Sequence, residues 1–427
     1  MKVRDRANRI AWRRCVVLAL IVITSGAARE LAAQELTAPG AESLEGRTGF
    51  KVGSGRLHPS IQLDSSFVTN PGRLSENQQS AFMLAGRPGF ELKMPSNQLD
   101  VSFGGDFEYQ KFFSEYDELS AFAGRATFAS VINKEGQISV RVNDHFMRSA
   151  EPGNQSITRR LMHVTNTAGL GFDLRPGGGA LDLSLDYSFF VDRYDRAESG
   201  QPETLDNMRH TPALRASLKL LPKTAVFVEA STTFTNFNKT AYVLPTGATG
   251  ASNVDSNILT SYVGLVSALT PKFSALLKAG YGNTFISGSD NFNSVVGQLE
   301  LTYQTTATMK LRGGYVRTVQ PVSLYKYYGL DKVYASYDVQ LAGRVTLAAG
   351  ADASLLTYGA PILDTGANGR ADIDVGGNLM VSYQTNEWFT VSVIDNVDLR
   401  TSSADAVFGA PVGYITNAVL LRLAARY

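Results

Sequence analysis

The side chains that most often do chemistry are few in this sequence, and their spacing fits no catalytic or metal-binding motif. The four histidines, His58, His145, His163 and His210, lie far apart and form no HExxH pair. The glycine patterns GxSxG, GxxxxGK and GxGxxG, which mark nucleophile elbows and phosphate-binding loops, are absent. The sequence therefore predicts no catalytic residue, no metal site and no cofactor, and it argues against an enzyme.

Charged residues at a regular spacing are the more informative set. From residue 181 to 191, Leu, Tyr, Phe and Val side chains alternate with Asp and Ser, and a period of two indicates a strand with one apolar and one polar face. The polar faces of such strands would carry Asp100, Asp106, Glu108, Arg125, Arg141, Asp182, Asp186, Arg215, Glu229, Arg312, Arg344, Asp372, Asp374 and Arg422. Charges of both signs cost little in water but need near-complete pairing in a closed core. We therefore expect these residues to line a hydrated lumen.

Four aromatic residues interrupt this polar face, namely Phe190, Phe227, Tyr262 and Tyr334. Aromatic rings exposed to a lumen could stack on the rings of sugars. The alternative is that they pack against the wall or against a loop.

The last fourteen residues, YITNAVLLRLAARY, define the element that would close such a lumen. Val419, Leu421, Leu423 and Tyr427 share one face, and an exposed strand of this kind would recruit other chains unless it were paired and covered. In a transmembrane barrel it pairs with the first strand, and outer-membrane lipid covers its apolar face. This end resembles the terminal recognition strand of outer-membrane barrels, and the resemblance implies that Tyr427 is an assembly signal for the barrel assembly machinery.

The same alternating unit recurs from Leu57 to the end of the chain. Short turns are expected at residues 133–136, 176–179, 221–223, 270–272, 304–306 and 385–387, and longer polar loops at 70–79, 150–158, 193–209, 238–256, 288–291, 319–326, 360–369 and 402–412. Alternating short and long connections are typical of periplasmic turns and extracellular loops. The pattern predicts an all-β protein, a single antiparallel transmembrane barrel of about eighteen strands with sixteen as the alternative, and both termini in the periplasm. A soluble β-sandwich is the competing fold.

Two places leave the strand pattern open. Residues 343–350 fit either a turn or the middle of one strand. Asp395 falls on the apolar side of the strand from Phe389 to Leu399, which implies a bulge or a position above the hydrocarbon.

The chain divides into three parts by composition. Residues 1–33 combine a basic start, a short apolar run and small residues, as in a cleaved secretory signal peptide. Residues 34–56 form a short polar periplasmic lead-in, and residues 57–427 form the barrel. The only cysteine, Cys15, lies in the signal peptide, so the mature chain would contain no thiol.

Cleavage would leave the mature chain mildly acidic, because the expected signal peptide contains seven basic and two acidic residues. This balance does not favour binding of nucleic acid. Export, alternating strands and an aromatic end together favour the outer membrane of a Gram-negative bacterium.

The segment 57–72, LHPSIQLDSSFVTNPG, together with tyrosine-bearing strands and short turns such as Thr270-Pro271, resembles a family of outer-membrane β-barrel porins. The likeness extends loosely over the whole barrel. Members of that family are often associated with exopolysaccharide production, so the resemblance implies a conduit for exopolysaccharide export that works with a periplasmic polysaccharide-export protein. The alternatives are a general or substrate-selective diffusion porin for small solutes, and a non-conducting structural or adhesion barrel whose long loops do the work.

Overall fold

The protein is described by a computed structural model that covers residues 49–113, 116–150, 158, 160–196, 202–240, 252–286, 291–362, 369–404, 406–407 and 410–427. The expected signal peptide lies outside the described residues, as does the expected lead-in up to residue 48. Residues 49–56 belong to the start of the sheet. There the short strand β1 (Phe50–Val52) pairs with the beginning of β2, which starts at Gly55 rather than at Leu57.

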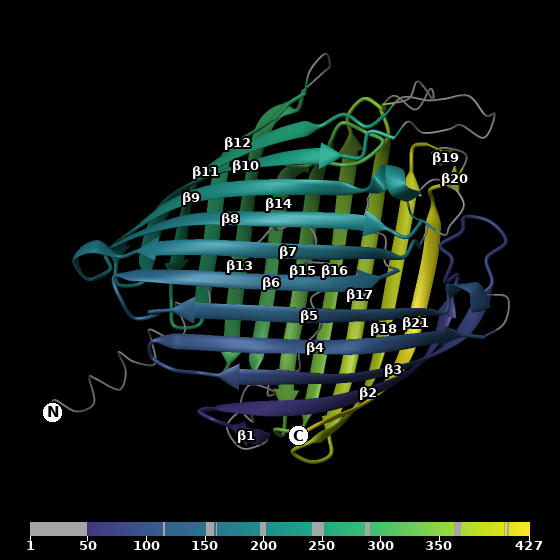
Figure 1. The fold of residues 1–427 in the computed structure, drawn as a ribbon, viewed down its shortest axis with the longest axis horizontal. Coiled ribbons are helices and arrows are strands. Elements are labelled where there is room, and N and C mark those ends of the chain that lie inside the picture. Colours follow the sequence, from purple (N-terminus) through teal and green to yellow (C-terminus); the bar gives the residue numbers. More distant parts are fainter. Residues whose placement is uncertain are drawn as a thin grey trace. The chain divides into compact units, whose positions relative to one another are not determined.

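Eighteen antiparallel strands form one ring, as the sequence predicted (Figure 1). They are β2 (Gly55–Thr69), β3 (Ser80–Met94), β4 (Leu99–Phe112), β5 (Ala121–Ile132), β6 (Ile138–Ser149), β7 (His163–Leu174), β8 (Leu181–Tyr194), β9 (Asn207–Leu221), β10 (Thr224–Phe237), β11 (Ser256–Ala268), β12 (Phe273–Phe285), β13 (Asn293–Thr306), β14 (Met309–Gln320), β15 (Tyr328–Leu341), β16 (Val345–Tyr358), β17 (Ala371–Gln384), β18 (Phe389–Ser402) and β21 (Tyr414–Arg426).

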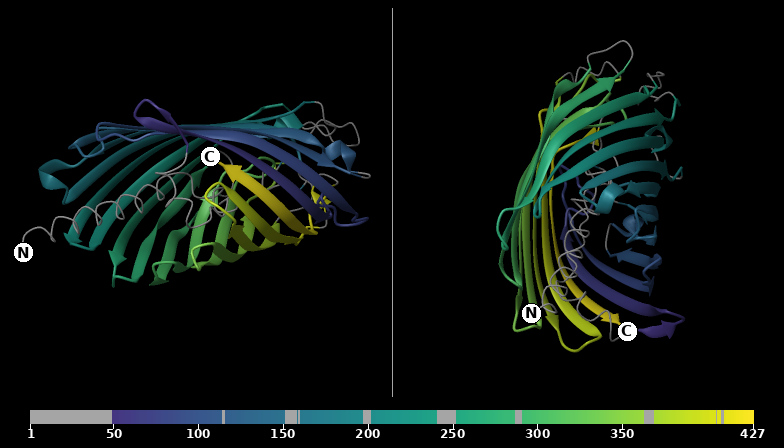
Figure 2. Two further views of the ribbon diagram at one scale, coloured as in Figure 1. Left: turned by 90° about the horizontal axis from the view of Figure 1, so that it is seen from below. Right: turned by 90° about the vertical axis from the view of Figure 1, so that its left-hand side faces the viewer.

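The first and last strands close the ring. Residues 60–69 of β2 pair with residues 417–426 of β21, with Ile61 opposite Ala425. The edge that the terminal strand would otherwise expose is therefore paired, which removes the usual route to aggregation at a free edge. Figure 2 shows the two walls of this ring, one built mainly from β2 to β9 and the other from β12 to β18.

The connections alternate between short turns at one end of the barrel and longer segments at the other. The sequence prediction did not include the turn at 95–98 or the connection 113–120, and it left residues 343–350 open between a turn and a strand. Ala342 and Gly343 both have positive φ, 49° and 70°, and this conformation reverses the chain before β16 begins at Val345. Residues 342–344 are thus a turn, and the following residues are a strand.

The remaining described elements are short. They are the strands β19 (Ala406–Val407) and β20 (Ala410–Pro411) and the 3₁₀ helices η1 (Asp117–Leu119), η2 (Pro176–Gly178) and η3 (Pro202–Leu205). In the part of the chain that the structure describes, no helix has the length and apolar character needed to cross a membrane.

Asp395 lies on the outer face of β18 without a bulge. Strand β18 keeps an unbroken register with both β17 and β21, so the expectation of a bulge at this position is wrong. The amide of Asn417 on β21 donates to the Asp395 carboxylate at 2.7 Å, which gives this outward carboxylate a local partner.

Candidate functional site

The inner face of the barrel can be assigned from side chains that meet inside one end of the ring. Tyr194 of β8, Tyr328 of β15, and Leu356 and Tyr358 of β16 belong to one buried apolar cluster. Strand β8 lies far around the ring from the paired strands β15 and β16, so the side chains that cluster must point into the lumen. Since side chains alternate along a strand, the other even-numbered residues of β8, β15 and β16 face the lumen too.

This alternation, carried from strand to strand through the pairing register, places nearly all the expected lumen residues on the inner face. They are Asp100, Asp106, Glu108, Arg125, Arg141, Asp182, Asp186, Arg215, Glu229, Arg312, Asp372, Asp374 and Arg422. Arg344 is the exception, because it is exposed in the turn after β15 instead of lying on the wall. The turn at Ala342 and Gly343 removes it from the strand alternation.

The first charged group of the lumen spans β3, β4 and β5. Arg87 donates from Nε to Glu108 Oε2 at 2.6 Å and lies 3.8 Å from Asp106. Asp106 also pairs with Arg125 on the next strand. The two carboxylates of β4 are therefore held between cations on both neighbouring strands.

A second group follows on β6, β7 and β8. One guanidinium nitrogen of Arg141 lies 2.9 Å from Asp173 and 2.8 Å from Asp186. The hydroxyl of Ser184 donates to Asp173 at 2.8 Å. One cation thus bridges two carboxylates on separate strands.

The third group joins β9, β10 and β12 around Glu229. Arg215 and Lys278 approach the two oxygens of this carboxylate at 3.5 Å and 3.4 Å. Both cations are largely buried, and burial of a cation is tolerated when an opposite charge compensates it. In each of these three groups opposite charges lie side by side, so this part of the described lumen wall presents hydrogen-bonding groups in which the charges compensate one another.

The four aromatic residues on the inner face are held in different ways. Phe227 is 2% exposed; the Arg215 guanidinium lies 4.0 Å from its ring centre, and a Cβ at Gly264 would come within 2.3 Å of the ring. This ring is therefore packed against the wall and offers no free face to a sugar. Gly264 is required at its position because any side chain there would displace the Phe227 ring.

The other three rings are half-buried. Lys278 lies 4.3 Å from the centre of the Tyr262 ring, and Arg209 lies 4.9 Å from the centre of the Phe190 ring. The Tyr334 hydroxyl donates to Glu300 at 2.5 Å. Contacts with charged neighbours fix these rings, and each keeps part of its surface open.

A fourth charged group lies near the end of the barrel that carries the long connections. Arg370 donates from Nε to Asp372 at 2.9 Å, and Arg400 lies 3.7 Å from Asp372 and 2.7 Å from Asp374. Arg370 and Asp372 are fully buried. Burial by itself lowers the pKa of Arg370, but the hydrogen bond to Asp372 and the nearby Tyr358 outweigh it, so the net pKa shift is upward.

Above this group, the long connections fold into the mouth and form a common core, which we call the mouth cap. It consists of Leu161, Tyr194, Leu205, Val322, Leu324, Tyr325, Tyr328, Leu356, Tyr358 and Val412. Leu161 follows β6, Leu205 follows β8, residues 322–325 follow β14, and Val412 precedes β21. Because these four connections come from both walls of the ring, a single core that contains them extends from one wall to the other at the mouth.

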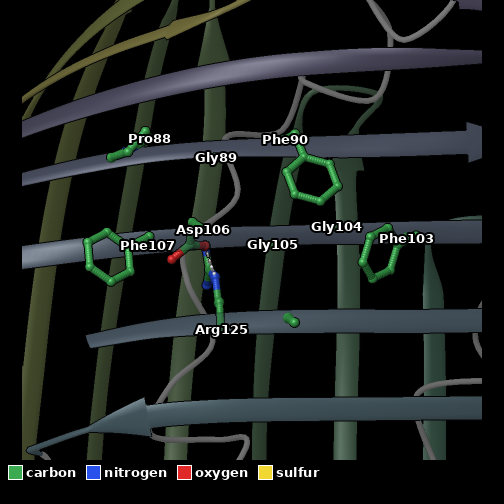
Figure 3. A pocket seen from close by; sticks show the side chains of 10 residues that line it. Pro88, Gly89, Phe90, Phe103, Gly104, Gly105, Asp106, Phe107 and Arg125 are labelled. Atoms are coloured by element: carbon green, nitrogen blue, oxygen red, sulfur yellow. Dashed lines mark hydrogen bonds and ion pairs between the residues drawn. The ribbon is translucent and has the colours of Figure 1, made fainter. Parts of the chain in front are cut away.

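A separate pocket of about 430 Å³ lies at the wall formed by β3, β4 and β5, and its lining also includes the lumen residues Asp106 and Arg125. Its rim contains Phe90, Phe103 and Phe107, its floor includes Gly105, and these residues face outward (Figure 3). The surface is mainly apolar, and an acyl chain of the surrounding lipid suffices to fill it.

The terminal aromatic residue lies at the seam of the ring, near the short-turn end. The backbone N–H of Tyr427 donates to the Pro59 carbonyl at 3.1 Å, and its ring centre lies 5.0 Å from that of Phe50. Tyr427 is half-exposed on the outer face, so the terminal ring extends the closing strand along the lipid-facing wall.

Sequence reasoning missed Arg87, Lys278 and Arg370 among the charged residues of the site. Lys278 could have been found, because it alternates with Leu277 and Ala279 on β12. Pro88 obscured the strand around Arg87, and Arg370 lies in a connection outside any periodic segment. Within the described ranges, no group of three or more His, Cys, Asp or Glu side chains could hold a metal ion.

Comparison with known proteins gives one family match. The sequence model of the family described as "Putative beta-barrel porin 2" matches residues 45–409. No curated protein matches the chain.

Several solved structures are similar to this fold. The outer membrane protein opdK from Pseudomonas aeruginosa is 9% identical, with a TM-score of 0.46 over 87% of this chain and 99% of that one. OccK7 (OpdD) from Pseudomonas aeruginosa is 11% identical, with a TM-score of 0.46 over 88% and 99%. The siderophore receptor PirA from Acinetobacter baumannii is 9% identical, with a TM-score of 0.45 over 87% and 80%.

Proposed function

The chain belongs to the family described as "Putative beta-barrel porin 2", and on this premise we propose that its barrel is the outer-membrane conduit of an exopolysaccharide export system. Membership makes it a porin-like barrel of the Gram-negative outer membrane, and the family is one of porins rather than of enzymes. The finer assignment, to sugar polymers, rests on the chemistry of the lumen.

The observation that carries the proposal is the local neutralisation of the lumen charges. Glu108, Asp186 and Glu229 each lie beside an Arg or Lys side chain. Such a wall exposes many donors and acceptors but little net field, and selectivity for ions of one sign usually comes from rings of like charge. A neutral chain rich in hydroxyl groups suits this wall better than a bare ion does.

Two partners complete the proposed system. The short-turn end of the barrel would face a periplasmic polysaccharide-export protein, which would deliver the polymer to the lumen. The barrel assembly machinery would insert the chain through its terminal strand, with Tyr427 as the signal.

Swelling of proteoliposomes tests the preference for neutral sugars. We expect the purified barrel to admit neutral oligosaccharides faster than anionic or cationic solutes of the same size. If neutral oligosaccharides entered no faster than charged solutes of the same size, or if only one charged class entered, the proposed lumen chemistry would be contradicted.

A diffusion porin for small solutes is the second candidate, and the mouth cap favours it. A core that extends across the mouth leaves less room for a polymer than for a small solute. The two candidates differ in their size limit, since a diffusion porin would pass monosaccharides and exclude longer oligosaccharides under all conditions.

A further inference from the structure

The mouth cap consists of two halves that are each anchored to their own part of the wall. In the first half, Asn238 after β10 donates from its backbone N–H to the Asp206 carbonyl at 2.9 Å and from its side chain to the Glu203 carbonyl at 2.9 Å. These bonds fix the connection that contains η3 against the start of the β10–β11 connection.

The second half is anchored on the other side of the mouth. The N–H of Ile362, after β16, donates to the Leu324 carbonyl at 3.1 Å. Tyr325 forms an isolated β-bridge with Pro361, and Arg370 lies 5.4 Å from the centre of the Tyr325 ring. The β14–β15 connection is thus fastened to the β16–β17 connection.

Besides the apolar core that the two halves share, one polar side chain forms hydrogen bonds with both of them. Asn253, which is 5% exposed, donates to the Thr204 carbonyl at 2.5 Å, and its own carbonyl accepts from the Leu324 N–H at 2.9 Å. A second hydrogen bond between the halves, from the Ser323 hydroxyl to the Leu205 carbonyl, is longer at 3.5 Å. Asn253 therefore ties one half to the other through a single buried side chain.

The residue that Asn253 holds is in an unfavourable conformation. Leu324 has a φ of 70°. This value is left-handed, and a bulky residue, whose Cβ makes the conformation unfavourable, adopts it only when its surroundings impose it. Loss of the tie would allow this residue to return to an ordinary conformation, which favours separation of the halves.

From these contacts we propose that the mouth cap is a two-part lid, closed by Asn253, that opens to let a sugar polymer leave the lumen. The inference rests on the proposed conduit and adds how it is regulated. A lid of this kind reconciles an occupied mouth with the passage of a polymer, because the halves cover the mouth for part of the time and separate transiently to let the polymer through.

Three forms of the purified barrel test the lid. Asn253→Ala removes both bonds of the tie. Asn257→Ala is the matched control, since Asn257 is the same residue type nearby but is exposed on β11. Leu205→Cys combined with Ser323→Cys places a thiol on each half, and the only natural cysteine is Cys15, so no other thiol in residues 34–427 competes.

Single-channel recording and trypsin cleavage after Lys326 give independent readouts. We expect Asn253→Ala to shift the closed–open equilibrium toward open by about tenfold, as the loss of two buried hydrogen bonds implies, and to speed cleavage. Asn257→Ala should behave as the wild type. The double cysteine variant should stay closed and resist cleavage when oxidised, and recover when reduced.

The outcomes separate the lid from the conduit. If the wild type conducts and neither Asn253→Ala nor the oxidised cysteine pair changes conductance or cleavage, the lid is wrong and the conduit stands. If no folded variant conducts, including one whose cleavage shows that its cap has opened, the proposed conduit itself is contradicted and the lid falls with it.

Discussion

Asp372 shows how one residue can hold two buried cations inside the barrel. It is fully buried between Arg370 and Arg400, and Ser402 also donates to it, at 2.5 Å. Removal of one partner from a buried ion pair leaves an uncompensated charge, which costs far more than the pair contributes when intact.

We therefore expect Asp372→Asn to lower the free energy of unfolding by about 3–5 kcal/mol. Urea titration of the folded barrel, followed by heat-modifiability on gels, measures the change. Asp352→Asn is the control, because Asp352 pairs with Lys332 at 2.9 Å but is about one-third exposed, and we expect it to cost less than about 1 kcal/mol. Equal effects of the two variants would contradict the role of burial.

Tyr427 is the second residue whose removal has a definite consequence. Deletion of this residue removes a ring that packs beside Phe50 and a bond to the Pro59 carbonyl, along with the proposed assembly signal. We expect a marked fall in the amount of barrel in the outer membrane, measured by fractionation and blotting. Tyr427→Phe keeps the ring and should assemble normally; unchanged levels after the deletion would exclude the terminal role.

At the scale of the element, the alternation of each strand decides which side meets lipid. Leu185 of β8 is 49% exposed on the outer face, whereas Asp186 faces Arg141 in the lumen. Leu185→Arg should destabilise the barrel by about 2–4 kcal/mol if it lies near the bilayer midplane.

Asp186→Asn is the paired control for that strand. It should leave folding intact, because Arg141 retains Asp173 at 2.9 Å. Heat-modifiability compares the two variants directly. The facing assignment fails if both substitutions are tolerated equally.

The strands could be read from the sequence because their signal is local. Segments such as β4 and β8 repeat every two residues, and this repeat needs no knowledge of distant neighbours. The turn at 342–344 was ambiguous because Ala342 and Gly343 are followed closely by a second run of small residues at 348–351, which conceals where the alternation stops.

The mouth cap could not be read in this way. Leu161, Leu205, Leu324 and Val412 come from connections without periodicity, separated by up to 251 residues in the chain. Their contact depends on the closure of the ring, which brings distant connections together. The same holds for Asn253, whose two partners lie in two other connections.

At the scale of the whole barrel, closure of the ring and a polar inner wall are what a porin-like channel through a lipid bilayer requires. The ring satisfies the backbone within the membrane. Its inner wall balances charges locally, and four of its long connections contribute side chains to the mouth cap.

The most direct test is single-channel conductance of residues 34–427 in planar bilayers, with neutral oligosaccharides of increasing length added on the short-turn side. We predict open events that are interrupted by the sugars, with block that lengthens as the oligosaccharide grows. Conductance that no oligosaccharide interrupts would contradict the sugar conduit and leave a diffusion porin as the function of the barrel.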